Sequence, residues 1–312
     1  MGKLAFVFPG QGSQAIGMCA DLAVHFPLVS DSFDVASAAL GYDLWQVVQA
    51  GPAAELNRTE ITQPALLSAG YAIWQVWQQR QGRQADILAG HSLGEYTALV
   101  CAGVLEFAAA VKLVQRRGQL MQAAVSADAG GMAAIIGLDD EAITGLCEQA
   151  AEGAVLSAAN FNSPGQVVIA GELAALERAC TLAKSIGAKM AKRLDVSVPS
   201  HCALMQTAAD TFAADLQAVE FAAPQIPVVQ NVDAQHHTDP ASIRTILLQQ
   251  LYRPVCWRQS ITGMRAAGVD RIVECGPGKV LAGLIKRIDK TIDCYNIQDT
   301  TSLDNTLEEV AR

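Results

Sequence analysis

The sequence lacks an excess of positive charge. Its 22 lysines and arginines are outnumbered by 31 aspartates and glutamates, which gives a formal net charge of -9 at pH 7. General nucleic-acid binding needs a basic footprint, so this balance argues against that class of function. A local basic patch can still act against the average, so an acidic protein partner is compatible with the composition.

Metal-binding and disulfide patterns are missing as well. The 8 cysteines are spread along the chain without a Cys-x-x-Cys pair. Neither metal-ligand spacing nor a dense disulfide framework can be assigned. Scattered thiols suit a reducing cytosol. We therefore expect a cytoplasmic protein without a bound metal.

Long hydrophobic runs are also absent. The apolar stretch Lys3–Phe8 ends at Pro9-Gly10, which is too short for a signal peptide or a membrane span. Met1-Gly2 begins like a myristoylation site, but Phe6 stands where that site needs Ser or Thr. We expect a soluble protein with no membrane partner.

Apolar residues are plentiful, at 51% of the chain against 17% charged, so a core is easily buried. Short apolar runs between the 25 glycines favour strands alternating with helices, the α/β class. Buried strands are predicted at Lys3–Phe8 and Asp86–Gly90. A helical pattern runs from Asp21 to about Gln49, and another helix follows Thr62-Gln63-Pro64.

A different element order occupies the middle of the chain. From Gly130 to about Val198 the pattern is strand, helix, strand, strand, helix, strand, which is the ferredoxin-like motif. The α/β pattern resumes at Pro227–Asn231 and Arg271–Glu274. We expect residues 1–128 and 198–312 to form the catalytic α/β domain, with a small ferredoxin-like domain of residues 129–197 inserted in it.

The pentapeptide Gly90-His91-Ser92-Leu93-Gly94 fits the G-x-S-x-G nucleophile elbow. This chemistry needs a strand-to-helix turn so tight that the serine Oγ projects from the sheet. The N–H of Leu93 would then point at a developing oxyanion. A chance glycine-rich turn is the alternative, but the predicted strand before and helix after favour Ser92 as a nucleophile.

A nucleophilic serine needs a base. Of the 5 histidines, His91 adjoins Ser92 and should diverge from it at a sharp turn. His201 follows a strand end and a proline, a typical position for a functional loop, and is the best candidate. Its orienting group stays open, because Asp195 need not face the ring and a backbone carbonyl could serve instead.

Arg117 is the most informative charge. On a helical wheel for residues 110–125 it falls at the centre of the apolar arc. A buried guanidinium is costly unless it is paired. Either an internal Asp or Glu pairs with it, or it binds an anionic ligand such as a substrate carboxylate, which its planar fork matches.

Two glycine-rich segments imitate nucleotide-binding motifs. Residues 10–15, GQGSQA, fit the dinucleotide fingerprint, but the helical pattern around Asp31 and Asp34 leaves no second strand with an acidic end. Gly276-Pro277-Gly278-Lys279 lacks the spacing of a phosphate loop. Turns are the better interpretation, although an NAD-dependent oxidoreductase remains a distant alternative.

Six segments carry a family resemblance: residues 8–14 (FPGQGSQ), 62–65 (TQPA), 90–95 (GHSLGE), 160–165 (NFNSPG), 198–201 (VPSH) and 274–278 (ECGPG). Together they closely resemble bacterial malonyl-CoA:acyl carrier protein transacylases. The resemblance extends from residue 1 to about 290, and the combination is highly specific.

The resemblance implies an α/β-hydrolase-like large domain with a ferredoxin-like insert. By motif position, Ser92 would be the nucleophile and His201 its base. Arg117 would bind the malonyl carboxylate. The implied reaction carries a malonyl group from coenzyme A to the phosphopantetheine thiol of acyl carrier protein, for fatty acid elongation. It needs no cofactor, since the coenzyme A thioester is a substrate.

The same resemblance assigns further residues. The backbone N–H groups of Gln11 and Leu93 would form the oxyanion hole, and the main-chain carbonyl of Gln250 would orient the histidine. Gln63 and Asn162 would line the pocket. Two rivals stay open: a serine hydrolase, with water as the acceptor, and a non-catalytic binding subunit that keeps the fold.

Acyl carrier proteins are acidic, so docking on this acidic chain would need a local basic cluster. The candidates are Lys189, Lys192 and Arg193 on the last strand of the insert, and Lys286, Arg287 and Lys290 near the C-terminus.

Overall fold

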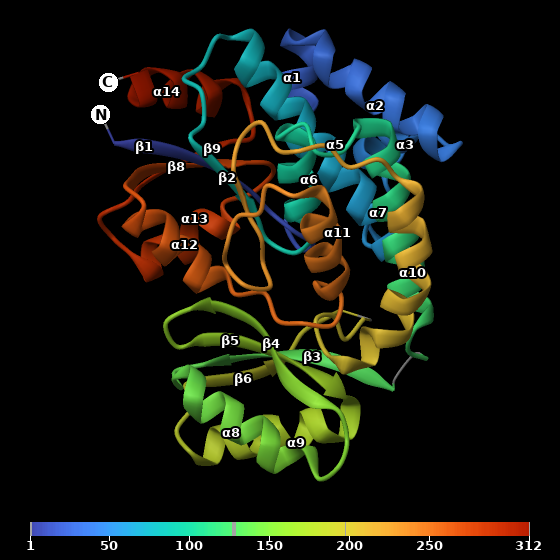
Figure 1. The fold of residues 1–312 in the computed structure, drawn as a ribbon, viewed down its shortest axis with the longest axis vertical. Helices are drawn as coiled ribbons and strands as arrows, with labels where there is room; N and C mark the ends of the chain where they lie inside the picture. The colour runs from blue at the N-terminus through green and yellow to red at the C-terminus, as the bar shows by residue number, and fades with distance from the viewer. Residues whose placement is uncertain (1, 127–128, 197, 312) are drawn as a thin grey trace.

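Parallel strands form the larger sheet of this protein. A computed structural model describes residues 2–126, 129–196 and 198–311. The strand order is β7-β2-β1-β8-β9, and each pairing is parallel. β1 lies at the centre (Figure 1). The strands are Lys3–Phe8 (β1), Ile87–Gly90 (β2), Val228–Val229 (β7), Val269–Cys275 (β8) and Asp293–Ile297 (β9).

Alternate residues of β1 face two different layers of helices. Phe6 and Phe8 pack in the larger core cluster, where the rings of Phe6 and Trp74 lie 5.1 Å apart. Ala5 and Val7 pack in a second cluster on the opposite face. This two-residue period is the pleat of a strand that is buried on both faces, so the apolar run at the N-terminus is explained.

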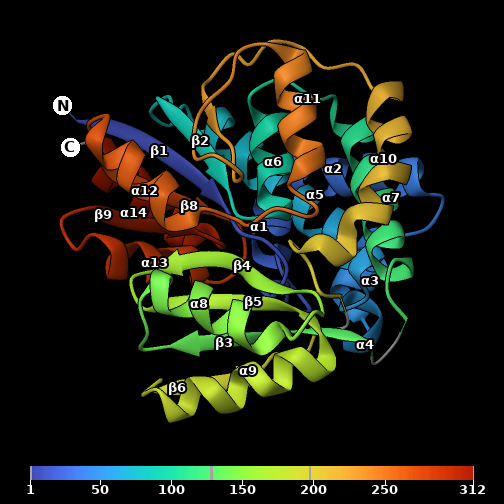
Figure 2. The same cartoon turned by 60° about the horizontal axis from the view of Figure 1, so that its bottom comes forward.

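Two helices, Trp257–Ala266 (α12) and Val280–Ile288 (α13), supply apolar side chains to the second cluster and lie on the same side of the sheet (Figure 2). The other helices of this part belong mainly with the larger cluster. They are Ala20–His25 (α1), Pro27–Leu40 (α2), Leu44–Ala50 (α3), Ala53–Leu56 (α4), Thr59–Gln79 (α5), Leu93–Cys101 (α6), Phe107–Ala123 (α7), Gln206–Ala218 (α10), Pro240–Gln249 (α11) and Thr300–Ala311 (α14), with a 3-10 turn at Ala203–Met205.

The prediction of one continuous helix from Asp21 to about Gln49 is wrong, because the segment is interrupted twice. Phe26 is extended and precedes Pro27, whose fixed φ fits the first turn of α2. Gly41 ends α2 in the left-handed region, with a φ of 80°. The helical prediction around Asp31 and Asp34 is nevertheless confirmed, since both lie in α2.

The next helix, α5, begins earlier than its proline suggested. The Arg58 carbonyl accepts hydrogen bonds from the N–H groups of Ile61 and Thr62, so the first turn is already closed at Thr59. Pro64 lies inside the helix.

The middle of the chain forms a separate antiparallel sheet of order β4-β5-β3-β6, drawn at the bottom of Figure 1. The element order is the predicted one: Gly130–Ile136 (β3), Asp140–Ala151 (α8), Leu156–Ser163 (β4), Gln166–Glu172 (β5), Leu173–Ser185 (α9) and Met190–Arg193 (β6). Both helices pack on one face in a core cluster of their own. The predicted domain edges at residues 128 and 197 lie outside the described residues.

Backbone hydrogen bonds tie this sheet to the larger part. Phe161 N–H donates to the Val255 carbonyl at 2.9 Å, and Val255 N–H donates to the Ala159 carbonyl at 2.8 Å. These bonds extend the free edge of β4 as a parallel bridge, so the small sheet is joined edge-on to the segment that precedes α12.

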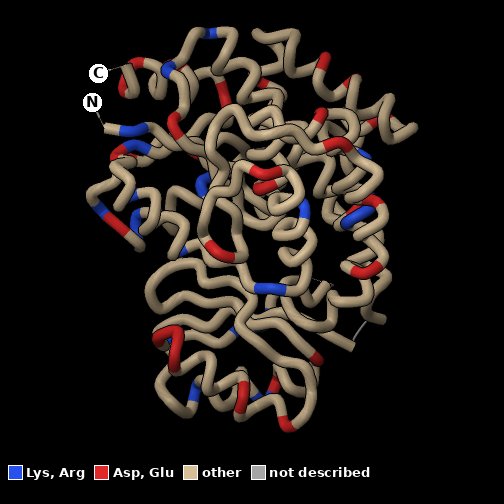
Figure 3. The backbone as a smooth tube through the Cα atoms, viewed as in Figure 1, with Lys and Arg blue, Asp and Glu red and all other residues tan. Residues whose placement is uncertain are grey.

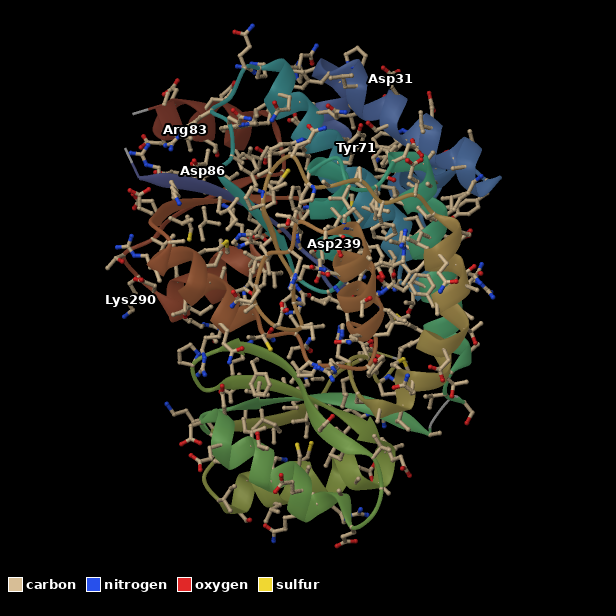
Figure 4. All side chains as sticks on the ribbon, viewed as in Figure 1. Asp31, Tyr71, Arg83, Asp86, Asp239 and Lys290 are labelled. Carbon is tan, nitrogen blue, oxygen red and sulfur yellow. The ribbon has the colours of Figure 1, made fainter. Side chains whose placement is uncertain are left out.

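At the other end of the molecule, Asp86 fixes the start of the central strand. Its carboxylate accepts from Leu4 N–H at 2.8 Å, and Arg83 lies beside it (Figure 4). The parallel strands β1 and β2 are thus aligned, so their carboxyl ends lie together, where parallel sheets place their sites. In the described ranges, none of the helices has both the length and the apolar character needed to cross a membrane.

Candidate active site

Ser92 occupies the turn between β2 and α6, and its backbone is held at φ 52° and ψ -109°. Non-glycine residues rarely adopt a positive φ, and such strain concentrates at functional sites. A Cβ at Gly90 would overlap the backbone of Gly94, and a Cβ at Gly94 would overlap the backbone of Phe8. Both glycines are required by close approach, as a nucleophile elbow demands.

The structure brings Ser92, His201 and Gln250 together. Ser92 Oγ lies 2.8 Å from His201 Nε2, and His201 Nδ1 lies 2.7 Å from the Gln250 carbonyl oxygen. Because a carbonyl can only accept, Nδ1 carries the ring proton and Nε2 is left to accept from the serine hydroxyl. The sharp loop that presents the ring gives His201 a φ of 64°.

The charge state of His201 follows from its surroundings. Burial and, to a smaller extent, the positive charge of Arg117 lower the pKa of His201 to about 3, although the hydrogen bond to the Gln250 carbonyl acts in the opposite direction. The ring is therefore neutral near pH 7, which is the form that can take a proton.

Arg117 is buried, with 1% of its surface exposed. Its NH1 donates to Gln63 Oε1 at 2.9 Å, and its NH2 donates to Gln250 Oε1 at 3.0 Å and approaches Ser92 Oγ at 3.4 Å. Within the described part of the chain, no Asp or Glu forms an ion pair with it. Its Nε is buried without a partner among these residues. Of the two alternatives for this charge, the internal ion pair is not formed.

A cavity of about 260 Å³ opens beside these groups. Its walls combine the predicted polar residues with an apolar remainder that includes Met121, Met132 and Val198. The predicted residues that line it are Gln11, Gln63, Ser92, Leu93, Arg117, Asn162 and His201. Gln250 is fully buried behind this wall and reaches the cavity only through its partners.

The predicted oxyanion donors lie on two different loops. Leu93 is the first residue of α6, so its N–H has no partner within the helix and adds to the positive end of the helix dipole. Gln11 lies in the loop after β1 and lines the same cavity. Asn162 Oδ1 lies 2.8 Å from His91 Nε2, and both residues line this cavity.

Sequence reasoning missed two buried residues behind the elbow. Asn231 accepts from Ser92 N–H through Oδ1 at 2.7 Å and donates through Nδ2 to the Gly90 carbonyl at 2.6 Å. Glu95 is fully buried on α6 and accepts from Asn231 N–H at 2.9 Å. The signal for Glu95 was a lone carboxylate in the apolar helix LGEYTALVC, the same argument that singled out Arg117.

Burial raises the pKa of Glu95 to about 7, even though hydrogen bonds from Asn231, Gln250 and Gln230 and the charge of Arg117 oppose the shift. A second buried carboxylate, Glu274, lies at the end of β8 and accepts from two N–H groups at the start of α13. Burial raises the pKa of Glu274 to about 7 as well.

The predicted basic residues are exposed, but they do not form one patch. Lys189 precedes β6 instead of lying on it. Lys192 pairs with Ala134, on the sheet face that also presents Met132 and Leu194 to the cavity, whereas Arg193 points to the opposite face. Figure 3 shows basic and acidic positions interspersed around the molecule.

The C-terminal basic residues lie on the other side of the cavity. Lys286 and Arg287 occupy the last turn of α13, and Lys290 follows it. Arg287 donates a hydrogen bond to Gln166, which lines the cavity, so this helix end reaches the rim of the site.

A serine on a strained elbow, a neutral histidine and a buried arginine surround one cavity, an arrangement that can form an acyl-serine intermediate. The acyl transferase domain family matches residues 5–304, and the chain belongs to this family. Within it, the chain is 56% identical over 309 residues to the malonyl CoA-acyl carrier protein transacylase of Salmonella typhimurium, covering 99% of this chain and 100% of that protein.

Solved structures agree with this placement. An acyl carrier protein S-malonyltransferase from Vibrio cholerae superposes with a TM-score of 0.96 at 58% identity, covering 97% of this chain and 99% of that one. A malonyl-transacylase solved in complex with its type II polyketide synthase acyl-carrier protein superposes with a TM-score of 0.97 at 54% identity, covering 98% of this chain and 99% of that one.

Proposed function

We propose that this chain transfers a malonyl group from coenzyme A to the phosphopantetheine thiol of acyl carrier protein, through an acyl-enzyme on Ser92, and so supplies fatty acid elongation. The observation that carries the proposal is the buried Arg117 guanidinium 3.4 Å from Ser92 Oγ. An acyl group attached to that oxygen and ending in a carboxylate would place its charge within reach of the guanidinium. An acyl group without a terminal carboxylate, such as acetyl, would offer Arg117 no such partner.

The first half-reaction loads the enzyme. His201 Nε2 takes the Ser92 proton as Oγ attacks the thioester carbonyl, and the N–H groups of Gln11 and Leu93 stabilise the oxyanion. The intermediate collapses with cleavage of the C–S bond. The coenzyme A sulfur leaves with the proton held by His201, and malonyl-Ser92 remains.

The second half-reaction reverses these roles. The phosphopantetheine thiol gives its proton to His201, and its sulfur attacks the ester carbonyl of malonyl-Ser92. The oxyanion forms in the same hole, because the carbonyl carbon has not moved. The C–O bond breaks, and Ser92 recovers its proton from His201, so the cycle ends with the enzyme unchanged.

Arg117 also couples the substrate to the base. Its charge is one of the causes that lower the pKa of His201. A bound malonyl carboxylate offsets that charge, so the histidine becomes a stronger base when the malonyl group is in place. The proposed reaction needs no cofactor beyond the coenzyme A thioester, and we place it in the cytoplasm.

We also propose a domain division that follows the two sheets. Residues 1–128 and 198–312 would form an α/β-hydrolase-like domain, and residues 129–197 a ferredoxin-like insert. The parallel order β7-β2-β1-β8-β9 and the antiparallel order β4-β5-β3-β6 support this division. The site lies between the two units, since Asn162 and Met132 of the insert line the same cavity as Ser92.

Acyl carrier protein would dock at the rim of this cavity. Lys286 and Arg287 on α13 support the proposal. Lys192 lies on β6, the edge strand of the insert remote from β4, and Lys189, Arg193 and Lys290 are further exposed candidates. A thiol arm anchored on this rim would enter between α13 and the small sheet.

The rival serine hydrolase differs only in the acceptor, so the test compares acceptors directly. The rate of malonyl-CoA consumption is measured with and without phosphopantetheinylated acyl carrier protein. Malonylated carrier protein is quantified by mass spectrometry. We expect thioester consumption to depend on the carrier protein and to match its malonylation mole for mole. Equal consumption without the carrier would establish a hydrolase and overturn the proposal.

A further inference from the structure

Glu95 is a buried carboxylate that takes no part in the reaction as derived above. It lies on α6, three residues after the nucleophile, and none of its surface is exposed. A fully buried carboxylate needs hydrogen-bond partners, so its contacts show what it holds in place.

Its first contact orients Gln250. Gln250 Nε2 donates to Glu95 Oε2 at 2.8 Å and to the Ser92 carbonyl at 3.0 Å. Both partners accept, so the amide NH2 must face them, and Oε1 must face the other way. There it accepts from Arg117 NH2 at 3.0 Å.

Two amide oxygens thereby fix the arginine. Gln250 Oε1 accepts from NH2 and Gln63 Oε1 accepts from NH1, while Nε has no partner among the described residues. The guanidinium edge that approaches Ser92 Oγ through NH2 is the one left for a ligand, because Nε is buried. Rotation of the guanidinium would misplace that edge, so the amides set the direction in which Arg117 can bind a carboxylate.

Its second contact reaches the elbow. Glu95 Oε2 also accepts from Asn231 N–H at 2.9 Å, and the Asn231 side chain holds Ser92 N–H at 2.7 Å. One carboxylate oxygen is therefore shared by the residue that orients the arginine and the residue that holds the nucleophile.

We propose that Glu95 is a positioning residue for malonyl selectivity: it fixes the Gln250 amide, and through it the orientation of Arg117 relative to Ser92. This inference rests on the proposed function, because it assumes that Arg117 binds the malonyl carboxylate. In this inference the selectivity comes from two linked hydrogen-bond acceptors, the Glu95 carboxylate oxygen and the Gln250 amide oxygen, and not from the charge of Glu95.

The test compares Glu95→Met with Glu95→Gln. Met keeps the volume but removes both acceptors, while Gln keeps one acceptor oxygen for Gln250 and Asn231. The readout is kcat/KM for acylation of Ser92 by malonyl-CoA divided by kcat/KM for acylation by acetyl-CoA. The concentration of active sites is determined by titration with a serine-reactive phosphonate. We expect Glu95→Met to lower the ratio on the order of tenfold, the effect of losing one hydrogen bond, and Glu95→Gln to restore most of it.

Glu274 supplies the matched control. It is as buried as Glu95 and also accepts two N–H groups, but it holds the start of α13. Glu274→Met should lower stability and affect both thioesters alike, because they share coenzyme A, so the ratio should stay at the wild-type value. An equal change of the ratio in Glu274→Met would overturn the proposal.

A double-mutant cycle tests the same inference if Glu95→Met folds poorly. Gln250→Met removes the side-chain link but keeps the carbonyl that orients His201. It should lower the ratio by itself, and adding Glu95→Gln or Glu95→Met should lower it little further, since both act through one relay. Additive losses, an unchanged ratio, or a Glu95→Gln ratio as low as that of Glu95→Met would each reject the inference. Failure of wild type to form malonyl-Ser92 would instead reject the proposed function.

Discussion

His201 is oriented by the main-chain carbonyl of Gln250, which lies 2.7 Å from Nδ1. A backbone acceptor fixes the same tautomer that an aspartate fixes in a catalytic triad, but it adds no negative charge. The histidine therefore stays neutral beside the buried Arg117, and the site remains positive enough to receive an acyl group that carries its own carboxylate.

This arrangement predicts that Asp195 has no role in catalysis. Asp195 is the carboxylate closest to His201 in the sequence, and it is exposed in the structure. Asp195→Asn should keep kcat/KM for malonyl transfer within about twofold of wild type, since surface substitutions are usually small in effect. His201→Ala, measured in parallel, should lose nearly all acylation. A loss for Asp195→Asn that approaches that of His201→Ala would mean that a carboxylate orients the base.

Arg117 should determine the choice of acyl group. Arg117→Ala removes the partner of the malonyl carboxylate and should cost malonyl transfer about 2–5 kcal/mol, the scale for breaking a buried charge pair. It also removes an unpaired cation that penalises neutral acyl groups, so acetyl transfer should improve relative to malonyl. Arg117→Lys should rescue only partly, because the planar fork is lost.

The measurement for Arg117 is the ratio of kcat/KM for malonyl-CoA and acetyl-CoA in the three proteins. A ratio that stays constant would assign malonyl selectivity to another part of the cavity and leave Arg117 with a structural role only.

Lys286 should act on the carrier protein alone. It is exposed on the last turn of α13 and lies beside Arg287, which contacts the cavity rim. Lys286→Glu should raise KM for acyl carrier protein, most strongly at low salt, and leave acylation by malonyl-CoA nearly unchanged. Lys184→Glu is the control, because it makes the same charge change on α9, at the far side of the insert. Equal effects of the two substitutions would remove α13 from the docking surface.

Stability should depend on pH through His201. The pKa of His201 is lowered from 6.5 to about 3 by burial. Between these values the unfolded chain binds more protons than the folded one, so the free energy of unfolding falls as the pH is lowered from about 6.5 toward 3. At pH 5 the loss should be on the order of 2 kcal/mol.

Urea unfolding at pH 7.5 and pH 5 checks this contribution. His201→Gln should remove the contribution of His201 to the difference in unfolding free energy between pH 7.5 and pH 5. The same pH dependence in wild type and His201→Gln would show that the imidazole is not buried in its neutral form.

The elbow and the buried arginine could be found from the sequence because each violates a local rule. Ser92 lies between two glycines, Gly90 and Gly94, at which neighbouring backbone leaves no room for a Cβ. Arg117 is a charged residue on an apolar helix face. The small sheet was predictable in element order for a similar reason, since its strands and helices alternate with clear periods.

Gln250 and Asn231 could not be found from residue type and spacing alone. Both act through amide or backbone groups, which leave no trace in hydropathy or charge, and both reach Ser92 across more than a hundred positions of sequence. Gln250 was assigned only through the family resemblance. The breaks in the first helical segment were missed because Phe26 and Gly41 interrupt a pattern that remains apolar on one face.

Intact mass of the protein after mixing with malonyl-CoA tests directly whether Ser92 carries the malonyl group. A malonyl group adds about 86 Da when it replaces the serine proton, and peptide mapping locates it. We expect one such adduct on Ser92, its disappearance when phosphopantetheinylated acyl carrier protein is added, and no adduct in Ser92→Ala, which should keep its fold. An adduct on another residue, or malonyl transfer by Ser92→Ala above a few per cent of the wild-type rate, would contradict this assignment.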